Sequence, residues 1–250
     1  MTEISGSEVA PPGSRDEGWQ LREQVRPLVI GLSIGHSIGT VGSLGFFAGL
    51  RSGRTGIVST ASVLWPKGAR FGDRVHQPGR SENELLTART RIAKLLRTGR
   101  PPLAAATAID AAVAEILDGV KVAGNVLPAP AAEAGSPLGP PVDLAPDDLG
   151  EEVAFVGRTS GYSTGLISTI AIDNLSIERY TFDNCIEVRS PHGRFSRPGD
   201  GGALVYRRRD CAPIGLIFAR FDVSGGDPST FVMPLRPILQ TLDVSFLSAV

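Results

Sequence analysis

The fold is decided by the stretch Phe195–Leu204, which reads F-S-R-P-G-D-G-G-A-L. Its Pro-Gly-Asp segment at 198–200 favours a tight turn, because proline presets φ, glycine tolerates positive φ and aspartate hydrogen-bonds its own backbone. The glycine pair at 201–202 leads into the apolar residues 203–206, which have the composition of a strand. By itself the stretch predicts a turn followed by a strand, and the remainder of the chain must give it a context.

The bulk composition limits the class of protein. The chain has 250 residues, enough for one large domain or two small ones with a sizeable core. It contains 30 glycines and 19 prolines and is only 20% charged, which favours turns and short strands over long helices. The net charge of −1 gives no electrostatic argument for nucleic acid or an anionic membrane, so neither partner is predicted.

The cysteines, histidines and glycines do not form a cofactor or metal motif. Cys185 and Cys211 are too few for a disulfide framework, and we interpret them as core side chains while leaving open whether they pair. The three histidines lack the spacing of metal ligands. The glycines of residues 31–45 lack the G-x-G-x-x-G spacing of a dinucleotide loop. No cofactor and no metal are therefore predicted.

The first residues bear on localisation. Residues 1–24 are rich in Ser, Glu, Gly and Pro and contain little to bury, so a disordered tail is predicted. They lack a positive segment followed by an apolar run, and no window of the chain reaches the ~18 apolar residues of a membrane span. We therefore expect a soluble, cytoplasmic protein.

Short apolar segments separated by turn residues predict an all-β protein in two halves. The first half covers residues 25–117. It is expected to contain a hairpin of segments 41–50 and 56–64 and a strand at 92–96, whereas the alanine-rich segment 109–116 fits a strand or a helix.

A Pro/Ala/Gly-rich connection over residues 118–150 leads to the second half, residues 151–250. The second half ends in apolar residues at helical spacing after Pro234, which predicts a helix over 235–242. The strands expected there are 152–156, 165–172, 179–188, 203–206, 214–219 and 230–232.

Blocks of sequence between residues 25 and 244 resemble, in the same order, the bacterial trypsin-like serine peptidases. Each block alone is ordinary turn or strand sequence, and the weight lies in their order. The blocks are 33–36 (S-I-G-H), 39–42 (G-T-V-G), 58–64 (V-S-T-A-S-V-L), 72–79 (G-D-R-V-H-Q-P-G), 92–96, 109–114, 157–165 (G-R-T-S-G-Y-S-T-G), 195–205 and 214–219. The resemblance implies a chymotrypsin-like fold, all-β with two six-stranded antiparallel β-barrels and a short C-terminal helix, and a serine-type endopeptidase as the family activity.

The resemblance also locates the family's catalytic positions. The histidine position is Ser62, the aspartate position is Asp110 and the serine position is Gly201. The family mechanism needs a hydroxyl nucleophile and an imidazole that takes its proton. Neither is present at these positions, so we predict a pseudoenzyme rather than an enzyme. Without an imidazole, Asp110 is expected to find a hydroxyl or a backbone N–H, with Ser62 and Thr60 as candidates.

The leading hypothesis for function is a pseudoprotease that binds a peptide or protein partner in the cleft between the barrels. The backbone N–H groups of Gly199 and Gly201 would retain an oxyanion-hole-like site for a carbonyl or carboxylate. Phe195, Asp200 and Arg220 are expected to border the pocket of that cleft.

Two alternatives remain open. The first is an active endopeptidase with a rearranged site that uses His36 or His76. The second is a structural or interaction module of a larger bacterial complex, with the cleft closed because Phe195 and Arg220 fill it. The sequence leaves the oligomeric state open.

Overall fold

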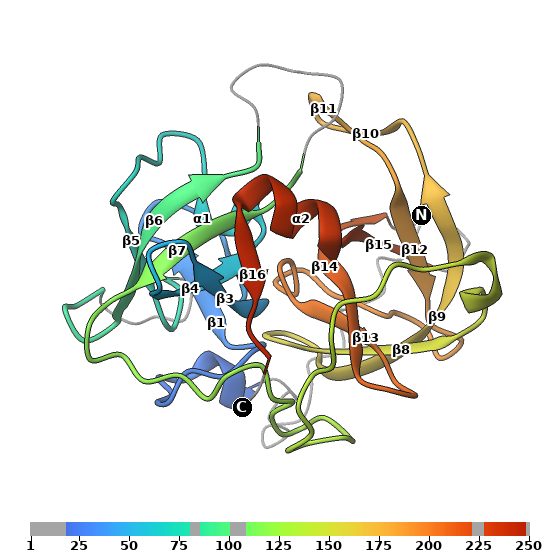
Figure 1. Ribbon diagram of the computed structural model, residues 1–250, viewed down its shortest axis with the longest axis horizontal. Helices are drawn as coiled ribbons and strands as arrows, with labels where there is room; N and C mark the ends of the chain where they lie inside the picture. Colours follow the sequence, from blue (N-terminus) through green and yellow to red (C-terminus); the bar gives the residue numbers. More distant parts are fainter. Residues whose placement is uncertain (1–18, 81–85, 101–108, 222–227, 249–250) are drawn as a thin grey trace, which may run out of the picture.

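The computed structural model describes residues 19–80, 86–100, 109–221 and 228–248, and these are mostly β-structure. Two large sheets lie side by side (Figure 1). The first is built mainly from the first half of the chain and the second from the second half. The helical segments among the described residues are short: η1 (Trp19–Arg22), α1 (Ala61–Leu64), η3 (Pro146–Asp148) and α2 (Leu235–Leu242). The all-β class and the C-terminal helix over 235–242 are therefore confirmed.

The first sheet is antiparallel, has eight strands and curls without closing. The strand order is β16-β3-β4-β7-β6-β5-β1-β2. The predicted first barrel is thus a curled half-barrel, and one of its edge strands comes from the end of the chain. The strands are β1 (Ser33–His36), β2 (Val41–Ser43), β3 (Phe46–Leu50), β4 (Thr55–Ser59), β5 (Arg74–His76), β6 (Arg91–Thr98), β7 (Ala112–Ile116) and β16 (Val244–Phe246).

The second sheet is a closed barrel in the order β12-β15-β14-β13-β8-β9. Closure leaves no exposed sheet edge around most of the barrel. A separate hairpin of β10 (Leu175–Ile177) and β11 (Tyr180–Phe182) extends from it toward the first sheet. The barrel strands are β8 (Glu152–Gly157), β9 (Gly161–Ile172), β12 (Cys185–Arg189), β13 (Leu204–Arg207), β14 (Ala212–Phe221) and β15 (Ser229–Pro234).

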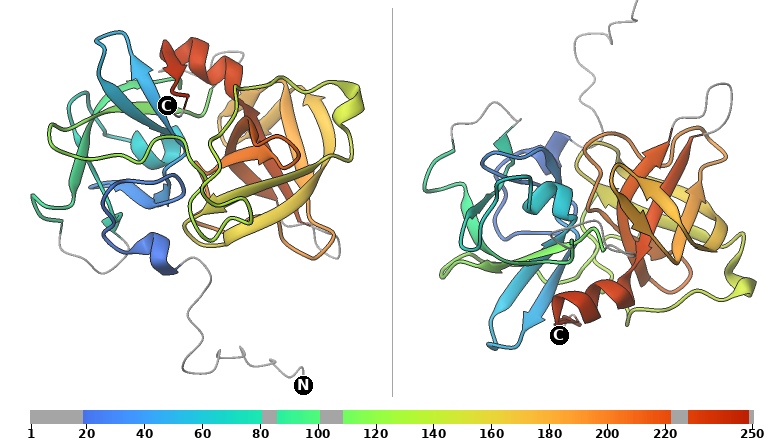
Figure 2. Two further views of the ribbon diagram at one scale, coloured as in Figure 1. Left: turned by 60° about the horizontal axis from the view of Figure 1, so that its bottom comes forward. Right: turned by 90° about the horizontal axis from the view of Figure 1, so that it is seen from above.

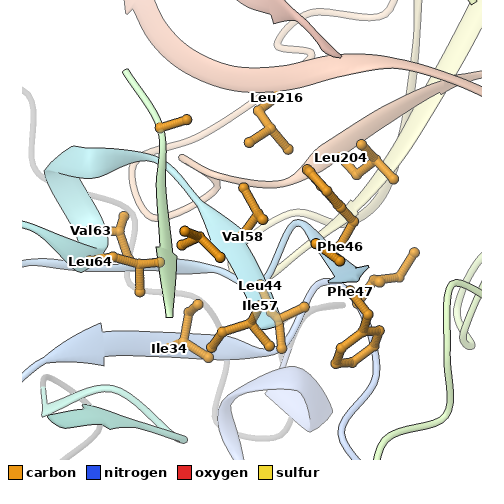
Figure 3. Packing of buried hydrophobic residues seen from close by; sticks show 14 of the residues in the cluster. Ile34, Leu44, Phe46, Phe47, Ile57, Val58, Val63, Leu64, Leu204 and Leu216 are labelled. Atoms are coloured by element: carbon orange, nitrogen blue, oxygen red, sulfur yellow. The ribbon is translucent and has the colours of Figure 1, made fainter. Parts of the chain in front are cut away.

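One hydrophobic core runs across the junction of the two sheets. Phe46, Phe47 and Ile57 from the first sheet pack in the same cluster as Leu204 and Leu216 from the barrel (Figure 3). All five side chains are at most 2% exposed. Burial of a large aromatic or aliphatic side chain contributes about 1.5–3 kcal/mol each. The two halves are therefore held together by shared packing.

The C-terminal segment also ties the halves together. Helix α2 buries Leu235, Ile238 and Leu242, which lie on one face because they are three and four residues apart. The helix ends at Asp243 in the left-handed conformation, and β16 then pairs with β3 of the first sheet. Figure 2 shows α2 in red beside the junction. The sequence analysis did not anticipate this last strand.

Several predicted boundaries differ from the structure. Segment 41–50 is divided into β2 and β3 at Leu44–Gly45, where a Cβ on Gly45 would lie 2.6 Å from the carbonyl oxygen of Gly202. The end of segment 56–64 is the helical turn α1 rather than strand. Segment 179–188 is divided by a turn at Asn184, whose φ is 55°. Segment 109–116 ends in a strand, β7.

Two segments that were predicted to lack regular packing, the tail 1–24 and the connection 118–150, contain ordered parts. Of the predicted tail 1–24, residues 19–22 form η1 and Leu21 is buried, whereas residues 1–18 lie outside the described residues. The 118–150 connection packs on the barrel: Asp148 is 2.7 Å from the Arg207 guanidinium, and Glu133 is 2.8 Å from that of Arg208. A buried arginine needs such a partner, so these ion pairs fix the connection in place.

Candidate functional site

Ser62 and Asp110 are in direct contact at the junction. Ser62 lies in α1, and its backbone N–H donates to Oδ1 of Asp110 at 3.2 Å. Asp110 precedes β7 and is only 3% exposed. Burial raises the pKa of the Asp110 carboxyl, against the lowering effect of the Arg100 guanidinium. The contact brings together two of the three predicted catalytic positions.

Asp110 is satisfied mainly by a residue that sequence reasoning missed. Nε of Arg100 forms an ion pair with Oδ1 of Asp110 at 2.9 Å. The predicted candidates contribute less: Ser62 uses its backbone, and its hydroxyl lies 3.0 Å from the hydroxyl of Thr60 instead. The signal for Arg100 is physical, because a buried carboxylate needs a cation or several donors. No sequence motif points to Arg100.

The 199–202 loop is held by Asp200, which is fully buried. Oδ1 of Asp200 accepts from the backbone N–H groups of Thr159 at 2.9 Å and Ser160 at 3.0 Å. Oδ2 accepts from the hydroxyl of Ser160 at 2.6 Å and the N–H of Arg197 at 2.8 Å. The carboxylate of Asp200 therefore braces the loop and does not point into a cleft as predicted.

Gly201 lies where the two sheets meet. Its carbonyl accepts from the backbone N–H of Ser43 on β2 at 2.8 Å. A Cβ on the neighbouring Gly42 would lie 2.5 Å from the Gly201 oxygen and 2.3 Å from Val63 in α1. Only a glycine at position 42 allows α1 and the 199–202 loop to approach this closely. Residues 62, 110 and 201 thus lie at one place in the fold.

The open side of this loop presents unused backbone donors. Neither the N–H of Gly199 nor that of Gly201 has a hydrogen-bond partner among the described residues. Gly199 has a φ of 101°, and a Cβ there would lie 2.4 Å from Arg158 and Thr159. A Cβ on Gly201, in contrast, would meet nothing within 4 Å. Position 201 therefore faces open space.

A cavity of about 890 Å³ adjoins Ser62. Its first wall is α1 and the residues that follow it, including Trp65, and its opposite wall is the β10–β11 hairpin of the second half. The guanidinium carbons of Arg100 and Arg179 each lie 5.1 Å from the centre of the Tyr180 ring. The cavity thus combines cationic and aromatic surfaces beside residue 62.

One strand edge beside the loop is unpaired. Residues 212–216 of β14 pair with β13, and Ile217 bonds to Ala203 at 3.0 Å. Beyond Ile217, β14 pairs with β15 on one side, and no described residue pairs with its other edge at 218–219. The N–H of Gly202 donates to the carbonyl of Ile217 at 2.7 Å, so the unpaired edge begins at the loop.

The two residues predicted to fill the pocket occupy different environments. Phe195 is 1% exposed and packs in the barrel core, with its ring 4.9 Å from that of Phe155 in an edge-on contact. Its side chain therefore stabilises the barrel and does not fill the cleft. Arg220 is partly buried on β14, just beyond residues 218–219.

The histidines considered for a rearranged site lie elsewhere. Nε2 of His36 is 3.2 Å from Asp73, and its Nδ1 accepts from the N–H of Ile38, so both ring nitrogens are engaged. His76 is buried against the hydroxyl of Thr90 at 2.9 Å. Both histidines line a second cavity, separate from Gly201, which gives a rearranged catalytic site no supporting contact.

The remaining candidate groups carry no chemistry here. Cys185 and Cys211 are free, and burial raises the pKa of Cys185 to about 12, so it is unsuited to act as a thiolate. Among the described residues, no group of three or more His, Cys, Asp or Glu side chains is arranged to hold a metal ion. The helices of the described part of the chain are too short or too polar to span a membrane.

No family model matches the sequence, and no curated protein matches it. Solved structures do match. Nocardiopsis protease (NAPase) has a TM-score of 0.63 at 18% identity, over 87% of this chain and 97% of that chain. Thermobifida fusca protease A has 0.61 at 15%, over 88% and 98%. A glutamic acid specific serine protease has 0.64 at 14%, over 88% and 100%.

At these identities the likeness shows the fold, which is the double-barrel fold of chymotrypsin-like serine proteases. The sequence analysis predicted that the chain is not an enzyme, and the comparisons contradict this. The matching structures are those of proteases, so the scaffold is one on which enzymes are built. The error came from reading the residue types at 62 and 201 as if they decided activity for the whole fold.

Proposed function

We propose that the junction between the two sheets binds an extended segment of a peptide or protein. The observation that carries the proposal is the unpaired edge of β14 at residues 218–219, which begins beside Gly201. An extended chain gains affinity by adding its backbone hydrogen bonds to such an edge. The proposal concerns recognition of the segment and holds whether or not the segment is then cleaved.

The 199–202 loop supplies a second contact for the bound segment. The N–H groups of Gly199 and Gly201 have no partner among the described residues. A backbone carbonyl or terminal carboxylate of the segment would accept from these donors. Asp200 keeps their loop in place through its bonds to the N–H groups of residues 159 and 160. The donors therefore fix the position of the segment along the β14 edge.

The cavity beside Ser62 would receive side chains further along the segment. Its volume of about 890 Å³ exceeds what one side chain fills, and Trp65 and Tyr180 offer aromatic faces. Arg179 is exposed at its rim and Glu178 lies next to it, so both signs of charge are present. The cavity thus favours an amphipathic segment with at least one apolar side chain.

The test is fluorescence polarisation with fluorescein-labelled extended peptides that carry Leu, Phe, Glu or Lys at the middle position. We expect saturable binding for at least one peptide. Gly201→Trp should weaken it about tenfold or more, because the new side chain enters open space at the loop and blocks the segment. Mass spectrometry of the same mixtures reads turnover independently of binding.

The matched control is Ser52→Trp, which places the same side chain in the exposed turn between β3 and β4. It should bind the peptides as the wild type does. Circular dichroism of both variants shows whether the fold is kept. The proposal is wrong if no peptide binds saturably, or if Gly201→Trp binds as well as Ser52→Trp.

A further inference from the structure

A second cavity, of about 620 Å³, opens on the first sheet. It lies in the part of the chain that carries the two histidines and adjoins the cavity beside Ser62, with which it shares Gly68. Its lining is dominated by cationic and titratable side chains, with Asp73 as the one carboxylate. The polar side chains that line it are His36, Ser37, Arg70, Asp73, Arg74, His76 and Arg91.

Strand register brings the basic residues together. Arg74 and His76 are two residues apart on β5, so their side chains project on the same side of the strand. Arg91 on β6 is the direct cross-strand partner of His76. Cross-strand partners lie side by side on one face of a sheet, so the cluster is built by regular structure.

The arginines of this cavity have no carboxylate partner among the described residues. Arg70, Arg74 and Arg91 make no ion pair with any described residue. Nη1 of Arg74 is buried and has no hydrogen-bond partner in the described part of the chain. A buried guanidinium nitrogen without an acceptor costs free energy, which a bound acceptor would recover. Arg207 on the barrel, in contrast, pairs with Asp148 and Asp210.

Asp73 does not neutralise the cluster. Its Oδ2 accepts from Nε2 of His36 at 3.2 Å and from the backbone N–H of Arg70 at 2.7 Å. These bonds hold the turn before β5 in place. The carboxylate is thereby held in the loop, and the three guanidinium groups outnumber it among the described lining residues.

The environment of His76 is a further sign of positive potential in this cavity. The hydroxyl of Thr90 donates to the carbonyl of Thr87, so Nδ1–H of His76 donates to Thr90 at 2.9 Å. Burial lowers the pKa of His76, and the nearby Arg91 and His36 lower it further. A neighbouring positive charge disfavours protonation, so the cavity already carries a positive potential that an anion would offset.

We propose that this cavity binds the dianionic group of inorganic phosphate or of a phosphomonoester. Guanidinium groups bind phosphate oxygens through paired, charge-assisted hydrogen bonds, and three arginines line this cavity. The cavity has room for an organic group attached to the phosphate. The site does not depend on the peptide cleft proposed above, because none of its arginines contacts the 199–202 loop.

The test is isothermal titration of the full chain with inorganic phosphate, phenyl phosphate and a phosphoserine peptide, at ionic strength held constant with sodium chloride. We expect saturable binding. Arg91→Gln should raise Kd about tenfold, because one charge-assisted contact is lost. Arg91 is exposed and its side chain makes no hydrogen bond or ion pair with a described residue, so the variant should keep its fold. Arg74→Gln should raise Kd at least as much.

The control is Arg194→Gln, which removes the same charge at an exposed position of the second half. It should leave Kd unchanged. Equal Kd for the two small probes supports a site for the phosphate group alone, and tighter binding of phenyl phosphate or the peptide supports a larger ligand. Absence of saturable binding by all three probes, or an equal loss in Arg194→Gln, overturns the proposal.

Discussion

Two buried carboxylates at the junction are held in different ways. Asp110, on the side of the first sheet, relies on the side chain of Arg100 and on N–H of Ser62. Asp200, in the second half, is surrounded by backbone N–H groups from segment 159–160 and from its own turn. Backbone donors to a carboxylate are present whatever the side chains of the residues that supply them. A carboxylate held by a long side chain instead depends on the identity of one residue.

The pKa values in the two halves follow the same division. Burial raises the pKa of Asp110, and Arg100 opposes it only in part. Glu187 of the barrel is also buried, and burial alone would raise its pKa. Hydrogen bonds from Ser229, Arg189 and other side chains nevertheless lower the pKa of Glu187 to about 2. The donors around Glu187 therefore outweigh the effect of its burial on the pKa, and those around Asp110 do not.

The largest effect expected from this comparison follows Asp200→Ala. The substitution leaves the buried donors of Ser160 and Arg197 without an acceptor, and each costs free energy. We expect the free energy of unfolding to fall by about 3–5 kcal/mol. Urea denaturation followed by circular dichroism measures it.

The control is Asp200→Asn, which keeps one oxygen as an acceptor and should cost less than the alanine variant. If both variants lose under about 1 kcal/mol, the backbone donors are satisfied in another way and the contrast between the two carboxylates fails.

A smaller effect is expected from Arg100→Met, which leaves Asp110 buried without its cation. We expect a loss of about 2–3 kcal/mol at neutral pH. The sign with pH follows from the raised pKa of Asp110: the folded state binds the proton more tightly, so stability decreases as pH rises above the ordinary value of 3.8. Without Arg100 this decrease should be steeper, and the gap between variant and wild type should close in acid.

The double variant Arg100→Met with Asp110→Asn sharpens this test, because it removes both charges. It should recover much of the stability lost by Arg100→Met at neutral pH and show no added pH dependence. A gap between Arg100→Met and the wild type that stays constant from neutral to acid pH would contradict the assignment, since the loss would then come from packing alone.

Elements that are specified by local residue types could be predicted from the sequence. The turn at 198–200 and the helix at 235–242 are set by local residue types, such as proline, glycine and periodic apolar side chains. The apolar pattern of segment 56–64 predicted a strand that continues to residue 64. Such a pattern does not distinguish the last residues of a strand from a short helical turn, which is what residues 61–64 form. Local patterns therefore fixed element types but not all of their ends.

Long-range pairings were out of reach of sequence reasoning. β16 is a short strand whose partner, β3, lies near the other end of the chain, and nothing in residues 244–246 specifies it. The ion pair of Arg100 with Asp110 likewise depends on how the curled sheet brings the two together. The predicted convergence of positions 62, 110 and 201 rested on a resemblance in block order, which is information about the whole fold.

The smallest effect is expected at Gly201, and it isolates the open side of the loop from its buried side. Gly201→Ser should change stability by less than about 1 kcal/mol, because its φ is ordinary and a Cβ there meets nothing within 4 Å. Gly202→Ser is the matched contrast: its φ is 88° and its Cβ would lie 2.0 Å from the hydroxyl of Ser59, so a loss of about 2–4 kcal/mol is expected. Urea denaturation of both variants decides this, and similar losses would mean that position 201 does not face open space.

The double variant Gly201→Ser with Ser62→His tests whether residues 62 and 201 can act together. The hydroxyl at position 201 of this variant should react with a fluorophosphonate faster than that of Gly201→Ser alone, since an imidazole beside Asp110 can take its proton. Equal reaction rates would place residue 62 out of reach of residue 201.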